Sequence, residues 1–173
     1  MKQIRLTKTL ASVCTACMLS TYAFNGTLVA SASVAESQVL MQEASAPSFE
    51  QRQALKLLND DRKDRGLPPL RFNSQLAKLA DSYARDMIKR DYFSHYDPDG
   101  QSPFDRIQKH DISFNYAGEN LAFNESVLAA QQAFMHSPVH KANILNTNYT
   151  QVGIGVVKGP AGRVYVVQEF IDG

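Results

Sequence analysis

The sequence predicts an α+β fold, because helical and strand patterns occupy different parts of the chain. Between residues 48 and 145, apolar residues recur at three- and four-residue steps through several segments. β-forming residues and apolar alternation are concentrated between residues 152 and 170. One short extended stretch, residues 115–122, lies between the helices. The chain has 173 residues and no internal repeat, which is enough for one domain with a proper core.

The first two predicted helices are marked by their start signals. Ser48 is followed three residues later by Gln51, which is a capping-box pattern, and Gly66 ends this helix after a charged stretch. The second helix begins at Asn73 or Ser74. The apolar stripe that would turn this helix toward the core consists of Leu76, Leu79, Ala80, Tyr83, Met87 and Ile88.

Three shorter helices are predicted in the middle of the chain. Ser102 precedes a proline at the first helical position, and this third helix ends near residue 110. Asn124 is the expected cap of a fourth helix. Ser137, again followed by a proline, opens a short fifth helix that runs through Leu145.

The C-terminal part predicts two strands joined by a turn. Residues 152–157 alternate, residues 159–162 read Gly-Pro-Ala-Gly, and residues 164–170 are rich in β-formers. Because the helices come first and the strands last, the pattern favours α+β over a parallel sheet.

Residues 1–32 have the pattern of a secretory signal peptide. Three basic residues precede a moderately apolar stretch, and small residues at its end offer a cleavage site. A short membrane anchor is the alternative, but serines and threonines interrupt the run, which falls short of the roughly 18 apolar residues that a span needs. Residues 33–47 are small and polar and are expected to form a flexible lead-in, so the predicted domain covers residues 48–173.

Cysteine content and charge restrict the chemistry and the partners of the mature chain. Both cysteines, Cys14 and Cys17, lie inside the predicted signal peptide, so the domain would have no disulfide. It would be held together outside the cell by core packing alone, or with a metal ion. Without residues 1–32, 15 basic residues face 17 acidic ones. No basic patch stands out, so we expect no nucleic-acid partner, and we expect no transmembrane segment in the mature form.

Three side chains are candidates for a polar site. His95 follows the second helix within an aromatic segment, and Glu119 lies beside the central extended stretch. His140 would be the third residue of the fifth helix, where free backbone N–H groups disfavour an added positive charge. Such an imidazole stays neutral, the form that binds a metal or accepts a proton. Each residue also has a plainer interpretation, because histidines can simply pack and a lone glutamate is usually exposed.

Other candidate chemistries have less support in the sequence. No Gly-x-Ser-x-Gly pattern surrounds Ser137, which we interpret as a helix cap and not as a nucleophile. His136 and His140 are four residues apart, as in a helical zinc pair, but Pro138 breaks the helical register between them. His110 has surface-like neighbours and no assigned role.

Six short motifs follow one another along the chain. They are Phe93–His95, Pro98–Gly100, Ser102–Arg106, Gly118–Ala122, Ser137–Leu145 and Val152–Gly155. In this order they resemble the CAP superfamily (SCP/TAPS) of cysteine-rich secretory, antigen 5 and pathogenesis-related 1 proteins, with the bacterial YkwD-like branch the most similar. The resemblance covers residues 49–170.

The resemblance implies a three-layer α-β-α sandwich around a small antiparallel sheet. It also implies a cleft lined by two histidines and two acids, and the matching positions are His95, Glu119 and His140. The second acid falls on Ser137, so one carboxylate of the family's tetrad is missing here. The disulfides of the eukaryotic branch are absent as well.

Two functions remain open on this basis, and the sequence does not decide whether the protein is an enzyme. The first is a secreted, extracellular or cell-envelope binding module whose His/Glu cleft holds a small ligand, a lipid or a cell-wall component. The second is a hydrolase assisted by a divalent metal such as zinc or magnesium. In that case His95 and His140 would bind the ion, and Glu119 would orient or deprotonate water.

The number of ligands weakens the metal-assisted hydrolase, and a structural role is a third interpretation. Catalytic zinc usually has three protein ligands, so two histidines hold it loosely unless Glu119 also coordinates it. In a third interpretation, Glu119 bridges the imidazoles of His95 and His140 as a purely structural polar cluster.

Overall fold

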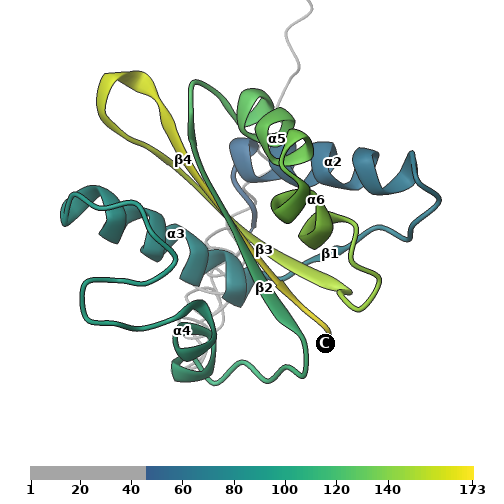
Figure 1. Cartoon of the computed structure of the whole chain (residues 1–173), viewed down its shortest axis with the longest axis horizontal. Helices are drawn as coiled ribbons and strands as arrows, with labels where there is room; N and C mark the ends of the chain where they lie inside the picture. The colour runs from purple at the N-terminus through teal and green to yellow at the C-terminus, as the bar shows by residue number, and fades with distance from the viewer. Residues whose placement is uncertain (1–45) are drawn as a thin grey trace, which may run out of the picture. The chain divides into compact units, whose positions relative to one another are not determined.

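The structure, a computed structural model, describes residues 46–173 and shows a sheet covered by helices on both faces (Figure 1). The elements are α2 (Phe49–Lys63), β1 (Arg71–Phe72), α3 (Ser74–Lys89), α4 (Pro103–Lys109), β2 (Ala117–Asn124), α5 (Val127–His136), α6 (Pro138–Ile144), β3 (Gln151–Lys158) and β4 (Val164–Ile171). The predicted signal peptide and most of the predicted lead-in lie outside the described residues. None of the helices within residues 46–173 combines the length and the apolar character that a membrane span requires.

The strands form one sheet with the order β1-β3-β4-β2. β4 pairs antiparallel with both β2 and β3, and Glu169 of β4 lies directly between Glu119 of β2 and Gly153 of β3. The predicted antiparallel sheet is therefore confirmed for the three long strands. The two-residue strand β1 adds a short parallel pair with β3, in a region where the sequence pattern predicts no strand.

Helix starts follow the sequence signals with one exception. Ser48 caps α2 in a complete capping box with Gln51, and Ser102 caps α4 in the same way. The predicted cap of the fourth helix is wrong: β2 continues through Asn124, and Ser126 instead accepts a bond from the backbone N–H of Ala129. Asn124 ends the strand, and the true cap lies two residues later.

Alternation along the strands gives the sheet two different faces. One face packs against α2, α5 and α6 through an apolar core of alternate residues such as Val152, Ile154 and Phe170. The other face packs against α3 and α4. On that second face, a side chain at Gly153 or Gly155 would overlap the backbone of α3, so these glycines let the helix lie directly on β3.

This architecture confirms the three-layer α-β-α sandwich. It also leaves two edges: β2 is one, and β3 becomes the other beyond the short β1. Glu119 lies on the edge strand β2 and on the face covered by α3 and α4.

Candidate functional site

His95 and Glu119 form a hydrogen-bonded pair at the β2 edge. Nδ1 of His95 lies 2.6 Å from Oε1 of Glu119. The Glu119 side chain is only 1% exposed, whereas that of His95 is 47% exposed, so the carboxylate is internal and the ring lies at the surface. As a carboxylate, Glu119 only accepts hydrogen bonds, so the proton of this bond is on Nδ1. The other ring nitrogen, Nε2, is then free to contact a ligand.

The loop that carries His95 is held in place by two helices. The hydroxyl of Tyr83, on α3, donates to the backbone oxygen of Ser94 over 2.6 Å. Nη1 of Arg106, on α4, donates to the backbone oxygen of His95 over 2.9 Å. The position of the imidazole therefore depends on packing between α3 and α4 as well as on Glu119.

Arg106 occupies the second oxygen of the Glu119 carboxylate. Nη2 of Arg106 donates to Oε2 of Glu119 over 2.6 Å, and both side chains are nearly inaccessible to solvent. The guanidinium also stacks on the ring of Tyr83, with its central carbon 3.4 Å from the ring centroid. Because burial removes water from both charges, each depends on the other, and the ion pair fixes the Glu119 side chain.

Glu169 brings a second carboxyl group to the same place. It lies opposite Glu119 on β4, is fully buried, and its Oε1 is 3.9 Å from Nη2 of Arg106. Within residues 46–173, neither of its oxygens has a hydrogen-bond partner. Burial and then the neighbouring Glu119 carboxylate raise the pKa of Glu169 well above its usual range. This shift favours the protonated form of Glu169, in which one guanidinium balances one carboxylate.

His140 reaches the β2 edge from the opposite face of the sheet, as the third residue of α6. Its backbone oxygen accepts a bond from Nδ2 of Asn120 over 3.1 Å. Its ring meets the ring of Phe134 edge-on, with centroids 5.3 Å apart. Burial and then the charge of His95 lower the pKa of His140, so its imidazole is neutral near pH 7.

All three predicted site residues thus lie on β2 or bond to neighbouring residues of β2. His95 is bonded to Glu119, and His140 is bonded through its backbone to the next residue, Asn120. The second partner of Glu119 is Arg106, so Glu119 does not bridge the two imidazoles. Neither of two cavities, of about 600 and 520 Å³, is lined by any of the three residues.

Other predictions about nearby residues had mixed outcomes. Ser137 stands at the predicted N-cap position of α6, but its side chain makes no capping hydrogen bond. His136 and His110 each hold a backbone oxygen of their own helix, at 2.7 and 2.9 Å from Nδ1. These bonds give both histidines a local structural role.

Sequence reasoning missed Arg106 and Glu169. Arg106 closes the Ser102–Arg106 motif and follows the acid of a capping box, and only the fold shows that it turns inward. Glu169 could have been noticed, because it is the one acid within the run of β-formers at residues 164–170. An acid at an alternate, inward position of a buried strand requires a partner.

A family comparison agrees with this geometry. Residues 55–170 match the family model described as "CAP: Cysteine-rich secretory protein family". The chain belongs to the CAP family. The matched range of this CAP domain includes every site residue described above.

Similar proteins come from several bacteria. YkwD of Bacillus subtilis is 36% identical over 128 residues, which cover 73% of this chain and 49% of that protein. The membrane protein YlbC of the same organism is 34% identical over 122 residues, which cover 70% of this chain and 34% of that protein. The CAP domain chain therefore spans about half or less of the length of these two relatives.

Solved structures share the fold. An extracellular SCP-domain protein from Bacillus anthracis has a TM-score of 0.66 at 33% identity, covering 70% of this chain and 40% of that chain. An outer surface protein from Borrelia burgdorferi has a TM-score of 0.66 at 27% identity, covering 70% of this chain and 91% of that chain. The predicted resemblance to CAP proteins, with YkwD among the relatives, is confirmed.

Proposed function

We propose that this protein is exported and that its CAP domain binds a small, hydroxyl-bearing ligand, such as a cell-wall fragment, at the His95–Glu119–His140 site. The supporting observation is that both carboxylate oxygens of Glu119 are already used, one by His95 and one by Arg106. Glu119 therefore serves to hold His95 and not to contact the ligand. The two imidazoles are left as the contacting groups.

The chemistry of these imidazoles favours a ligand with hydroxyl or amide groups. The bond to Glu119 leaves Nε2 of His95, in its neutral form, as a hydrogen-bond acceptor. His140 is neutral and offers one acceptor and one donor nitrogen. Sugar hydroxyls both donate and accept, so they match such a pair. Since the backbone of both histidines is fixed to β2 or α4, little ordering cost remains when the ligand binds.

Export is supported by the basic and apolar pattern of residues 1–32. It is also supported by two similar structures, which are described as an extracellular and an outer surface protein. Fractionation of cells expressing the full chain, followed by N-terminal sequencing, tests this proposal. We expect the protein outside the cytoplasm, beginning near residue 33; a cytoplasmic protein that still begins at Met1 would contradict it.

Ligand binding is tested by calorimetry with soluble disaccharide-peptide fragments of a bacterial cell wall. His95→Gln and His140→Gln should each weaken binding by about tenfold, which corresponds to about 1.4 kcal/mol. His136→Gln is the matched control, because His136 is an exposed histidine bonded only to its own helix. Equal affinities for the wild type and all three variants would contradict the proposal.

The residues present fit a divalent metal poorly. Two imidazole nitrogens remain, where a catalytic zinc usually has three protein ligands. Coordination by Glu119 as a third ligand would weaken its bonds to Arg106 and His95, and the buried guanidinium would lose part of its counter-charge. Within residues 46–173, no group of three or more His, Cys, Asp or Glu side chains is arranged to hold a metal ion. The metal-assisted hydrolase is therefore the weaker of the two candidate functions.

Calorimetric titration with zinc distinguishes the two candidates. We expect the same small heat from the wild type and from His140→Ala. A saturable heat in the wild type that His140→Ala abolishes would favour the metal-assisted hydrolase instead.

A further inference from the structure

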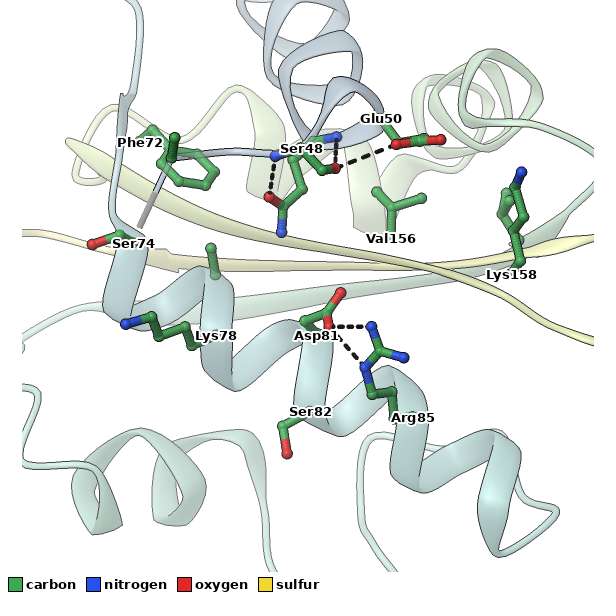
Figure 2. Close-up of a pocket in the computed structure, with 14 residues that line it drawn as sticks. Ser48, Glu50, Phe72, Ser74, Lys78, Asp81, Ser82, Arg85, Val156 and Lys158 are labelled. Carbon is green, nitrogen blue, oxygen red and sulfur yellow. Dashed lines mark hydrogen bonds and ion pairs between the residues drawn. The ribbon is translucent and has the colours of Figure 1, made fainter. Parts of the chain in front are cut away.

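A groove of about 600 Å³ lies far along the sheet from the histidine site, at its β3 edge. We call it the β3-edge groove. Figure 2 shows β3 crossing it, with the N-terminal turn of α2 on one side and α3 on the other. Its volume lies in the range of about 300–1,000 Å³ that ligand sites occupy. The lining residues used below are Gln51, Phe72, Lys78, Val156, Lys158 and Val164.

The floor of the groove is a strand edge with open backbone groups. The backbone oxygen of Val152 accepts from the N–H of Asn73, and that of Ile154 accepts from Nε2 of Gln51, both over 2.9 Å. Because strand residues alternate, the backbone N–H and oxygen of Val156 point to the same side. Among residues 46–173, nothing donates to that oxygen. The β3 edge is therefore available for pairing beyond Ile154.

The walls of the groove combine apolar surface with positive charge. Phe72, Val156 and Val164 supply apolar side chains. Figure 2 shows Lys78 and Lys158 toward opposite ends.

Among the described residues, these lysines are the unpaired cations of the groove. Neither forms an ion pair within the described part of the chain, whereas Arg85 is already paired with Asp81 over 2.9 Å. The remaining acid, Glu50, accepts a bond from the hydroxyl of Ser48. Lys78 and Lys158 thus have no ion-pair partner among the described residues, and with Glu50 included the groove keeps an excess of one positive charge.

We propose that the β3-edge groove binds an extended, acidic peptide segment of a partner protein, which adds to the sheet as a strand beside β3. The open stretch from Ile154 to Lys158 spans about 13–17 Å, enough for about five residues at roughly 3.3 Å each. Backbone pairing with Val156 supplies affinity, an apolar side chain packs beside the partly exposed side chain of Val156, and acidic side chains reach the two lysines. This proposal is independent of the histidine site, which lies at the other edge of the sheet.

Nuclear magnetic resonance titration of the full chain tests the proposal, with the blocked peptide Glu-Val-Thr-Val-Glu as the probe. We expect saturable shifts of the backbone amides of Ile154, Val156 and Lys158. The same peptide with N-methylated backbone amides should not bind, because strand addition needs the peptide's own donors. The peptide Lys-Val-Thr-Val-Lys should bind at least about fivefold more weakly, in line with a preference set by charge.

A variant in which the charges of both groove lysines are reversed tests the preference for acidic peptides. Lys78→Glu combined with Lys158→Glu should invert the preference and leave the fold intact, because both side chains lie on the surface of the groove. Equal binding of acidic and basic peptides, or shifts confined to residues outside the groove, would overturn the proposal.

Two other occupants would also overturn it. Binding of the peptide only after residues 1–45 are removed would identify the chain's own N-terminal segment as the occupant. A dimer in sedimentation that Val156→Pro abolishes would identify a second copy, since proline removes the donor that strand pairing needs.

Discussion

The two edges of the sheet, β2 and β3, differ in how side chains bond to their outward backbone groups. At the β2 edge, the outward backbone oxygens of Ala117, Glu119 and Phe123 accept bonds from the side chains of Tyr149, Asn143 and Arg163. At the β3 edge, side-chain cover ends with the bond from Gln51 to Ile154. An edge strand must be covered or remain open to pairing with another chain. Within residues 46–173, side chains thus cover three outward oxygens of β2, whereas on β3 this cover ends at Ile154.

The difference in side-chain cover indicates which kind of ligand each edge is suited to bind. At β2, the covering groups also fix the backbone of Glu119 and Asn120, which in turn bond to the ring of His95 and to the backbone of His140. Rigid side chains suit a small ligand, whose polar groups must meet them at fixed positions. At β3, the free groups are backbone groups, which suit an extended peptide.

The largest expected effect concerns the buried charge at the β2 edge. Glu119→Gln combined with Glu169→Gln leaves Arg106 without any carboxylate, and should cost about 3–5 kcal/mol of unfolding free energy. Glu119→Gln alone should cost less, because Glu169 lies 3.9 Å from Arg106 and can ionise in its place. Urea denaturation measures both, with the exposed Glu125→Gln as control. A loss below about 1 kcal/mol in the double variant would mean that this edge depends little on its ion pair.

A matched pair of truncations compares the edges directly. Asn143→Ala removes two bonds at the β2 edge, to the Glu119 oxygen at 3.2 Å and to Oδ1 of Asn120 at 2.9 Å. It leaves partners partly buried and should cost about 1–3 kcal/mol. Gln51→Ala removes the bond to Ile154 and half of a capping box, and should cost about 1 kcal/mol. Thermal unfolding measures both variants. A larger loss of stability in Gln51→Ala than in Asn143→Ala would contradict the difference between the two edges.

Glu169→Gln should stabilise the protein at alkaline pH. The raised pKa means that the folded state keeps a proton that the unfolded state releases, so stability falls as pH rises from the unfolded pKa toward the folded one. Glutamine mimics the protonated group and removes this loss. We expect a melting temperature higher by about 3–5 °C at pH 8, equivalent to about 1 kcal/mol, and no difference near pH 4. A lower melting temperature at pH 8 would show that Glu169 is ionised in the folded protein.

The smallest expected effect is the acid sensitivity contributed by His140. Its lowered pKa means that the unfolded state takes up a proton first, so stability is complete above the unfolded pKa and falls as pH drops through the folded one. His140→Gln should therefore flatten the decline of stability below about pH 6.5. Denaturation midpoints at several pH values measure this slope, and an unchanged slope would mean that the pKa of His140 is the same in the folded and unfolded states.

Much of the fold could be predicted because its signals are local. The capping boxes at Ser48 and Ser102, the periodic stripe of α3 and the alternation in β3 depend on nearby residues only. The two-residue strand β1 could not be predicted, because two residues carry no periodicity and its pairing with β3 is set by the tertiary fold. Asn124 gives a false cap signal, because asparagine suits both a strand end and a helix start.

Only part of the candidate site could be predicted from the sequence, because some of its contacts depend on the tertiary fold. His95, Glu119 and His140 each belong to a motif that can be recognised in the sequence. The spacing of residues does not show that Arg106 bonds to Glu119. The pairing of Glu119 with Glu169 depends on strand register between segments about 50 residues apart. Register is decided when the whole sheet packs, so the second buried acid became apparent only in the structure.

The central claim is that Glu119 holds His95 by its Nδ1 proton and leaves Nε2 free for a ligand. The imidazole ¹⁵N shifts of His95, recorded at pH 8, above the ordinary imidazole pKa of about 6.5, test it most directly. The bond of 2.6 Å to Glu119 predicts a protonated Nδ1 and a bare Nε2, and Glu119→Gln should weaken this preference. A proton on Nε2 together with a bare Nδ1 in the wild type would contradict the account, because the ring could then donate no hydrogen bond to Glu119 from Nδ1.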